Sequence, residues 1–118
     1  MSIRNYKDLL VWQRGIDLAV AAYRCTRTFP PDERYSLTQQ IRRAACSIPS
    51  NIAEGQGRYY RPEFLHHLSY ARGSLQELET ELIIAERLEF SFGIAPEIMH
   101  NRCDEVSKML AGLRRSLE

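Results

Sequence analysis

The chain has 118 residues, of which 44% are hydrophobic and 26% are charged, and its formal net charge is +1. This length supports a single domain spanning residues 1–118, and the composition is ordinary for a globular protein. No apolar run approaches the length of a membrane span, and the polar start lacks the apolar run of a signal peptide. We therefore expect a cytoplasmic protein with no membrane partner. The three cysteines form no Cys-x-x-Cys pair, which favours reduced thiols over a disulfide framework or a zinc site.

Two helices are predicted in the first half of the chain. The first covers residues 7–28, because apolar residues recur there at steps of three and four. Its expected buried face comprises Leu9, Trp12, Ile16, Ala19, Val20 and Tyr23. Pro30 and Pro31 end it. The second helix is expected from residue 32 or 33 to Glu54, because Gly55 and Gly57 mark a helix end.

Two further helices are predicted in the second half, over residues 61–89 and 95–117. Each carries apolar residues at alternating steps of four and three, which is a heptad seam. The seam of the third helix is Phe64, Leu68, Ala71, Leu75, Leu78, Leu82 and Ala85. The seam of the fourth is Met99, Cys103, Val106, Leu110, Leu113 and Leu117. Short connections between four long helices predict an all-α, antiparallel up-down-up-down four-helix bundle.

A row of polar residues accompanies the apolar face of the second helix. Asn51 and Pro49 lie in mid-helix, where each lowers helix stability. We therefore expect other interactions of this row to compensate for that loss. In a hairpin of the second and third helices, the numbers of facing residues should sum to about 116–120. This register places Gly73 near Ala44 and Ala45, where small residues permit close backbones. It also brings residues of the third helix to the polar row.

We predict that this polar row is buried, inside the bundle or between subunits, and that Arg43 pairs with Glu77. A solvated helix face is the alternative, and composition alone favours it. The predicted row comprises Gln40, Arg43, Ser47, Asn51, Glu54, Ser74 and Glu77.

Two Glu-x-x-His motifs, Glu63 to His66 and Glu97 to His100, are the sharpest sign of an enzyme. Metal-binding bundles use such motifs in pairs. Here both stand at the starts of antiparallel helices, which separates them by on the order of 40 Å. A phosphate loop at Gly55 is disfavoured because it follows a helix and no Lys-Ser/Thr comes after it. We therefore expect no enzyme, no catalytic residue, no metal, no cofactor and no small-molecule substrate.

Charge is distributed unevenly along the chain. Residues 34–61 carry a net charge of +4, and residues 62–92 carry −4. Adjacent segments of opposite sign indicate pairing within the chain or between subunits. The basic segment also supplies a candidate nucleic-acid rim, formed by Arg34, Arg42, Arg58 and Arg61.

Three stretches resemble one known family. They are the run 40–44 (QIRRA) with 47–49 (SIP) and 51–55 (NIAEG), the opening 6–12 (YKDLLVW), and 73–80 (GSLQELET). They are similar to the signature of the four-helix bundle proteins encoded in intervening sequences of bacterial 23S ribosomal RNA genes, also called the S23 ribosomal protein family. The resemblance implies a four-helix bundle that assembles as a homopentamer. A related branch, the accessory proteins of diversity-generating retroelements, is similar in fold and binds nucleic acid through a basic surface.

Two function classes follow. The first is a non-enzymatic homo-oligomer that acts as a structural or adaptor assembly. The second helix carries an apolar face and a separate polar row, which is more surface than a lone bundle needs to bury. The alternative is weak, sequence-tolerant binding of RNA or DNA through the arginine rims of that oligomer. A charge of +1 for each subunit is small for tight phosphate binding.

Overall fold

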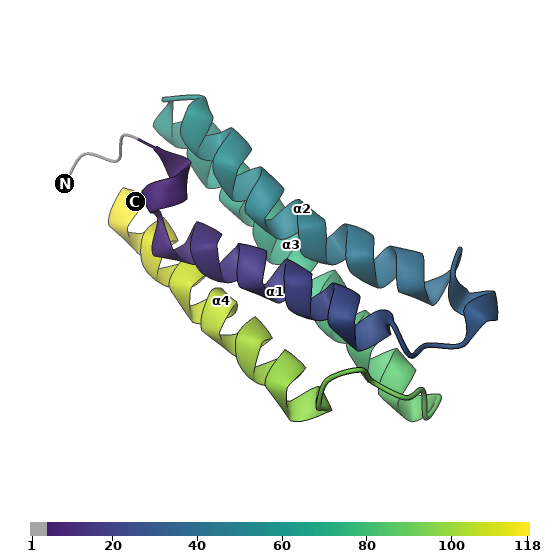
Figure 1. Ribbon diagram of the computed structural model, residues 1–118. Helices are drawn as coiled ribbons and strands as arrows, with labels where there is room; N and C mark the ends of the chain where they lie inside the picture. The colour runs from purple at the N-terminus through teal and green to yellow at the C-terminus, as the bar shows by residue number, and fades with distance from the viewer. Residues whose placement is uncertain (1–4) are drawn as a thin grey trace.

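The computed structural model describes residues 5–118, and four long helices make up most of them (Figure 1). Two short 3₁₀ turns precede the first two helices. The elements are η1 (Tyr6–Asp8), α1 (Leu10–Thr26), η2 (Pro31–Glu33), α2 (Leu37–Gly57), α3 (Arg61–Arg87) and α4 (Pro96–Leu117). No strand occurs among these described residues. The predicted all-α, up-down-up-down bundle is therefore confirmed.

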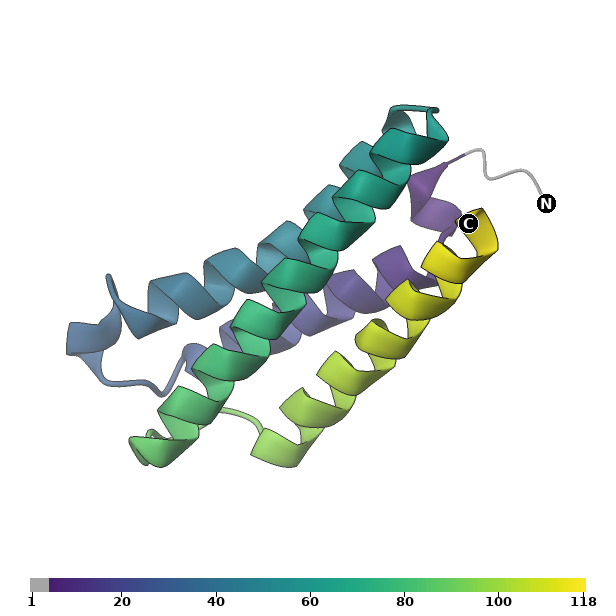
Figure 2. The same cartoon turned by 180° about the vertical axis from the view of Figure 1, so that it is seen from behind.

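The four helices stand at the corners of a square. Helix α2 packs against α1 and α3, and α4 packs against the same two helices from the other side. Across residues 5–118, the backbones of the diagonal helices, α1 with α3 and α2 with α4, do not approach each other closely. The start of α1 and the end of α4 lie at one end of the bundle, as the two opposite views show (Figures 1 and 2). The bundle thus has four sides, each formed by two neighbouring helices.

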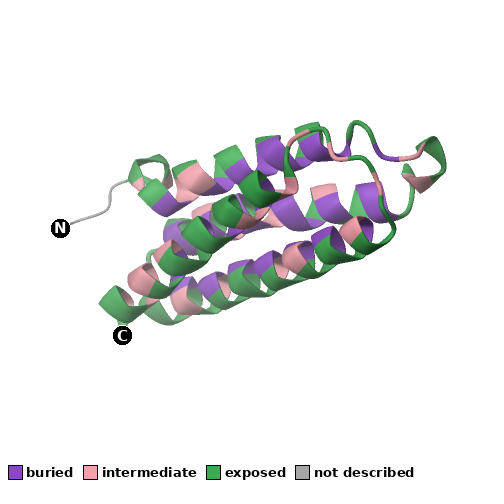
Figure 3. Cartoon of the chain, turned by 90° about the horizontal axis from the view of Figure 1, so that it is seen from below, coloured by how far each residue is buried: buried purple, intermediate pink, exposed green. Residues whose placement is uncertain are grey.

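The core runs along the inner faces of the helices (Figure 3). Both predicted heptad seams contribute to it: all seven seam residues of α3 are buried, and so are the first four of α4. Leu78 and Leu82 are 0% exposed, as is Val106 of α4. The last two seam residues of α4, Leu113 and Leu117, are partly buried against this core. Period alone therefore identified the inner faces of both helices correctly.

The predicted core face of α1 is wrong in part. Ile16, Val20 and Tyr23 are 37%, 44% and 43% exposed. The face that packs inward carries Val11, Gly15, Leu18, Ala22 and Cys25, of which Gly15, Ala22 and Cys25 are small. Gly15 is buried, and a Cβ built on it would lie 3.4 Å from the Cβ of Pro49, so α1 approaches α2 closely there. Close approach selects small side chains, and it leaves the larger apolar residues on the outside.

The predicted register between α2 and α3 is confirmed. Asn51 and His67, whose numbers sum to 118, share a hydrogen bond of 3.1 Å. The close approach, however, occurs at Gly55, where an added Cβ would stand 2.6 Å from the Cβ of His67. Gly73 is exposed with open space around it, which corrects the prediction that it faces Ala44. Gly55 therefore serves helix packing, and α2 continues three residues past the predicted end at Glu54.

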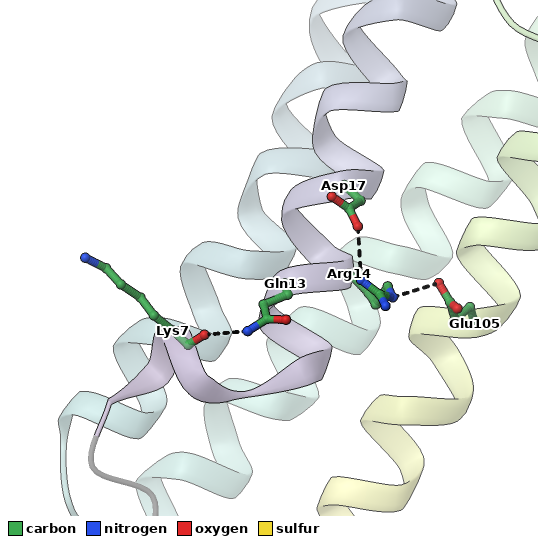
Figure 4. Close-up of polar contacts among 5 residues, drawn as sticks. All are labelled: Lys7, Gln13, Arg14, Asp17 and Glu105. Atoms are coloured by element: carbon green, nitrogen blue, oxygen red, sulfur yellow. Dashed lines mark hydrogen bonds and ion pairs between the residues drawn. The ribbon is translucent and has the colours of Figure 1, made fainter.

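Three polar contacts lie near the start of α1 (Figure 4). The Gln13 side chain donates to the backbone carbonyl of Lys7 at 2.9 Å, which ties η1 to α1. Arg14 stands between Asp17 at 3.3 Å and Glu105 of α4 at 3.8 Å. These charges are 38–49% exposed, so each pair contributes less than about 1 kcal/mol. Only the Arg14–Glu105 pair joins α1 to α4, and both pairs stabilise the bundle little.

Candidate interaction surfaces

A concave surface rich in arginine follows the α1–α2 side of the bundle. Three adjoining hollows form it, and they share Tyr23, Cys46 and Arg42 between them. No aspartate or glutamate lines any of the three hollows. We call this surface the arginine groove and define it by Tyr23, Arg24, Arg27, Arg34, Tyr35, Arg42, Arg43 and Cys46. Five arginines without an acidic neighbour in the lining make a surface suited to a negatively charged partner.

Two arginines of the groove are held by aromatic rings. The Arg42 guanidinium lies 4.5 Å from the ring centroid of Tyr23, and its Nε donates to the Thr26 hydroxyl at 2.9 Å. Arg34 lies 5.8 Å from the ring centroid of Tyr35. Cation–π contacts of this kind fix the plane of the guanidinium and leave its edge available. The groove therefore presents oriented cations beside apolar rings.

The predicted nucleic-acid rim divides between the two ends of the bundle. Arg34 and Arg42 line the arginine groove, whereas Arg58 and Arg61 lie at the turn from α2 to α3. A helix of 21 residues, the length of α2, spans roughly 30 Å between these ends. Arg58 is already paired with Glu54 at 3.1 Å and with Glu63 at 3.9 Å. One continuous rim from these four arginines is therefore not formed within the subunit.

Sequence reasoning missed the contribution of α1 to the groove. Arg24 and Arg27 lie outside the basic segment 34–61, so a count of charge along the chain could not join them to Arg42. Their signal is helical spacing, since Val20, Arg24 and Arg27 continue one outer face of α1 at steps of four and three. Only the packing of α1 against α2 brings the two sets of arginines together.

The predicted burial of the polar row inside the bundle is wrong. Gln40, Arg43, Glu54 and Glu77 are exposed in the subunit, and the remaining members, Ser47, Asn51 and Ser74, are half-buried. Among the described residues, Arg43 and Glu77 do not pair with each other. The row points outward because the buried face of α2 is occupied by Ile41, Ala44, Ala45, Ile48 and Ile52. Arg43→Ala should consequently cost the lone subunit little, and burial between subunits stays a prediction.

Asn51 is the polar-row residue that joins the two helices. Its amide nitrogen donates to the Ser47 carbonyl at 2.8 Å, and its oxygen lies 3.1 Å from Nδ1 of His67. Ser47 donates in turn to the Ala44 carbonyl at 2.8 Å. These bonds satisfy the mid-helix asparagine, whose cost to the helix made it conspicuous in the sequence. His67 also marks which way α3 faces at this point, toward α2.

A second heptad stripe of α3 begins one step after His67. Residues 70, 74, 77, 81, 84 and 88 follow at steps of four and three, so they continue the face that His67 turns toward α2. Tyr70, Ile84 and Leu88 are 52%, 45% and 55% exposed. We call this stripe the α3 edge and define it by Tyr70, Ser74, Glu77, Glu81, Ile84 and Leu88. Its spacing from His67 predicts that it follows the α2–α3 side, next to the side that holds the arginine groove.

Glu81 is the buried charge of the α3 edge, with 5% of its surface exposed. The pKa of its carboxyl is raised to about 7, first by burial and then by the nearby charge and the hydrogen bond of Glu77. Its Oε1 is buried with no hydrogen-bond partner among the described residues. A buried carboxyl oxygen without a partner costs stability, so Glu81 stands out from the solvated acids of the same helix.

The two Glu-x-x-His motifs lie at opposite ends of the bundle, at the starts of α3 and α4 (Figure 2). His100 contacts the Glu86 carboxylate, and His66 packs edge-on against Tyr70. No group of three or more metal-ligating side chains occurs in residues 5–118. The structure therefore brings neither motif to the other.

The three cysteines differ in their surroundings. Cys25 and Cys103 are 0% exposed, and burial is the largest cause that raises the pKa of each thiol to about 12. Cys46 is half-buried and lines the arginine groove. All three are free thiols. Cys46 is therefore the thiol that a reagent in solution can reach.

The fold and surfaces define an up-down-up-down helical bundle with two exposed, chemically distinct sides. No helix in the described part of the chain is long and apolar enough to cross a bilayer. A family model for the 23S rRNA-intervening sequence protein matches residues 7–112. The chain belongs to this family, and the resemblance drawn from its sequence motifs is confirmed.

A solved structure agrees with this family. It is the crystal structure, at 1.70 Å, of a protein of unknown function from the S23 ribosomal protein family of Bacteroides thetaiotaomicron VPI-5482. The two chains superpose with a TM-score of 0.78 and 25% identity, covering 92% of this chain and 98% of the other. None of the curated proteins compared with the chain matches it.

Proposed function

We propose that the protein is a non-enzymatic structural or adaptor assembly of identical subunits, with five subunits in the assembly. The observation that carries this proposal is the exposure of apolar side chains on two neighbouring sides of the bundle. They are Ile16, Val20 and Tyr23 on α1, and Ile84 and Leu88 on α3. Grouped apolar residues with polar neighbours are typical of surfaces that a protein partner covers. The number five rests on the family resemblance.

The non-enzymatic part of the proposal rests on how the candidate catalytic groups are engaged. The two Glu-x-x-His motifs stand at opposite ends of the bundle. His67 is held by Asn51, and His100 by Glu86. The buried thiols of Cys25 and Cys103, with pKa values raised to about 12, are poor nucleophiles. The conspicuous chemistry of the surface is recognition by charge and apolar contact.

The test is the mass of the protein in solution. Sedimentation or light scattering at micromolar concentration should report a mass several times 13.7 kDa, close to five subunits. Val20→Glu and Ile84→Glu should each lower that mass, because each puts a charge into a covered apolar surface. Ile98→Glu is the matched control, since Ile98 of α4 is 44% exposed, like Val20 at 44% and Ile84 at 45%. A monomeric wild type, or three variants that behave alike, would contradict the proposal.

Nucleic-acid binding is the second candidate function, and the five arginines of the arginine groove favour it. Tyr23 and Tyr35 add rings on which bases can stack. Binding of this kind should be weak, tolerant of sequence and steeply salt-dependent, because phosphate contacts release counterions. Arg58 and Arg61, at the other end of α2, would extend the contact only across subunits.

Retardation of a structured RNA at low salt tests this candidate. The wild type should retard the RNA, and Arg34→Glu should abolish retardation without changing the mass of the assembly. Reversing Arg58 and Arg61 together to glutamate tests the second cluster in the same way. Lys108→Glu, on the exposed face of α4, is the control for a change of net charge. Failure of the wild type to retard RNA at low salt, where charge attraction is strongest, would eliminate this function.

A further inference from the structure

The arginine groove and the α3 edge have complementary chemistry. The groove offers five arginines, and Ile16 and Val20, which line the same hollow as Tyr23, add exposed apolar side chains beside them. The α3 edge offers two glutamates, Glu77 and Glu81, together with exposed apolar residues at both ends of the stripe. Each surface combines exposed apolar side chains with charged groups, and the two surfaces carry charges of opposite sign. Neither surface is complementary to itself.

Both surfaces follow heptad spacing, which helices use to pack against one another. On α1, residues 16, 20 and 23 step by four and three, and Arg27, the residue that follows the helix, continues the spacing. On α3, residues 70, 74, 77, 81, 84 and 88 step in the same manner. Within each helix, a different stripe already packs into the core of its own subunit. A helix with two such stripes can pack against a helix of its own bundle and a helix of another.

The positions of the two surfaces suit a closed ring. The groove lies on the α1–α2 side and the α3 edge on the α2–α3 side, and these sides share α2. Neighbouring sides of a square bundle face directions about 90° apart. A ring closes when the two contact faces of a subunit are inclined by about 90° for four subunits or about 108° for five. Opposite sides of the bundle would instead give an open chain of subunits.

The α3 edge also has unsatisfied polar groups in the lone subunit. Glu81 Oε1 is buried without a partner among the described residues, and Glu81 hydrogen-bonds to the exposed Glu77. Across residues 5–118, Arg43 makes no ion pair, and it comes from α2, the helix that both sides share. Arg42 and Arg34 lie against aromatic rings, which leave the edges of their guanidinium groups available to the same neighbour. A guanidinium from a neighbour at Glu77 would neutralise the pair of carboxyl groups.

We propose that the arginine groove of one subunit holds the α3 edge of the next, so that a second copy of this chain covers each groove and the contacts run head to tail around a ring. This inference rests on the proposed homo-oligomeric function and names its interface. Arg43 of one subunit meets Glu77 of the next, and Cys46 lies beneath the apolar end of the neighbouring α3 edge. The groove is then a protein interface and not a nucleic-acid site.

Cys46 is a native reporter for this interface, because it lines the groove while Cys25 and Cys103 are fully buried. Alkylation of Cys46 in the assembled wild type should be about tenfold slower than in a dissociated subunit, since access limits the reaction. Ile84→Glu, a change on the α3 edge, should raise the alkylation rate of Cys46 to the dissociated value. Ile98→Glu should leave the rate unchanged.

Charge reversal supplies a second measurement. Arg43→Glu and Glu77→Arg should each raise the dissociation concentration of the assembly about tenfold, and the double variant should recover most of that loss. The reversals Asp104→Arg and Lys108→Glu, both at exposed positions of α4, are the matched controls. Circular dichroism checks that every variant stays helical.

The outcomes separate this inference from the proposed function. A wild type that is monomeric removes both. If the wild type assembles but its Cys46 is fully reactive, the proposed interface is wrong and the oligomer stands. The same conclusion follows if the charge-reversed variants assemble as the wild type does. Protection of Cys46 that appears only when RNA is added assigns the groove to nucleic acid and also overturns the inference.

Discussion

Helix α3 carries two stripes of residues with the same period, one buried in the core and the other exposed in the subunit at its apolar positions. Leu75, Leu78 and Leu82 of the first stripe are at most 2% exposed, whereas Ile84 and Leu88 of the second are 45% and 55% exposed. Both stripes step by three and four along α3, and the second ends at Leu88, the residue that follows the last turn of the helix. Periodicity therefore shows that a stripe can pack against a helix, but it does not show whether that helix belongs to the same chain.

The two stripes also differ in their content of ionisable residues. The first stripe contains no ionisable residue, whereas the second contains Glu77 and Glu81. A buried carboxyl inside a bundle must find its partner within the subunit, and an edge can obtain it from a neighbour. The comparison suggests that the first stripe determines the stability of the subunit and the second determines its association.

Truncation of one leucine in each stripe tests that division, and it should give the largest effect. Leu78→Ala should lower the free energy of unfolding of the subunit by about 3 kcal/mol, because it removes methyl groups from a fully buried site. Leu88→Ala should lower it by less than about 0.5 kcal/mol, because Leu88 is largely exposed in the subunit. Urea unfolding below the concentration of association measures both. Equal losses would show that the two stripes are not distinct.

Two glycines sharpen the comparison between the packed and the open parts of α2 and α3. Gly55→Ala should lower the free energy of unfolding by about 2 kcal/mol. The new Cβ would stand 2.6 Å from the Cβ of His67, and that atom cannot move aside because it is bonded directly to the backbone. Gly73→Ala should instead stabilise the subunit by about 0.5–1 kcal/mol, since its position is open and helical. Thermal unfolding of the two variants provides the measurement. A stabilising Gly55→Ala would mean that α2 and α3 do not approach closely there.

Much of the fold could be predicted from sequence because two of its features are local. The heptad seams of α3 and α4 identify the inward faces of both helices. The short turn between α2 and α3 fixed the register that the Asn51–His67 hydrogen bond confirms. The prediction of the inward face of α1 failed, because Ile16 and Val20 are more hydrophobic than Gly15 and Ala22. Close packing of α1 on Pro49 favours the smaller set, and that depends on another helix.

The interaction surfaces were harder to predict, for a related reason. Arg34 and Arg42 were found by counting charge along the chain, but Arg24 and Arg27 join them only through the packing of α1 on α2. Glu81 was not singled out, because a glutamate on a helix resembles any solvated acid. Its burial depends on neighbours that the sequence does not place beside it. Surfaces that combine two helices need the packing of those helices to be known.

The pH dependence of stability should give the smallest effect, and it tests the burial of Glu81 on the α3 edge directly. The pKa of Glu81 in the folded subunit is raised to about 7, above its ordinary value of 4.5. Between these two values the folded state holds a proton that the unfolded state has released. Stability should therefore fall as pH rises through this window, and below pH 4.5 the contribution of Glu81 should be constant.

Glu81→Gln replaces the carboxyl by a neutral amide of the same shape, so it should flatten the stability profile between pH 4.5 and about 7. At pH 8 the variant should be more stable than the wild type by on the order of 1 kcal/mol, because it no longer holds a buried charge. Glu77→Gln is the matched variant: it removes the neighbouring charge but leaves the burial of Glu81, which is the largest cause of the shift. It should move the fall in stability to lower pH without abolishing it. Urea unfolding across this pH range, on subunits too dilute to associate, would refute the assignment if wild type and Glu81→Gln had the same slope.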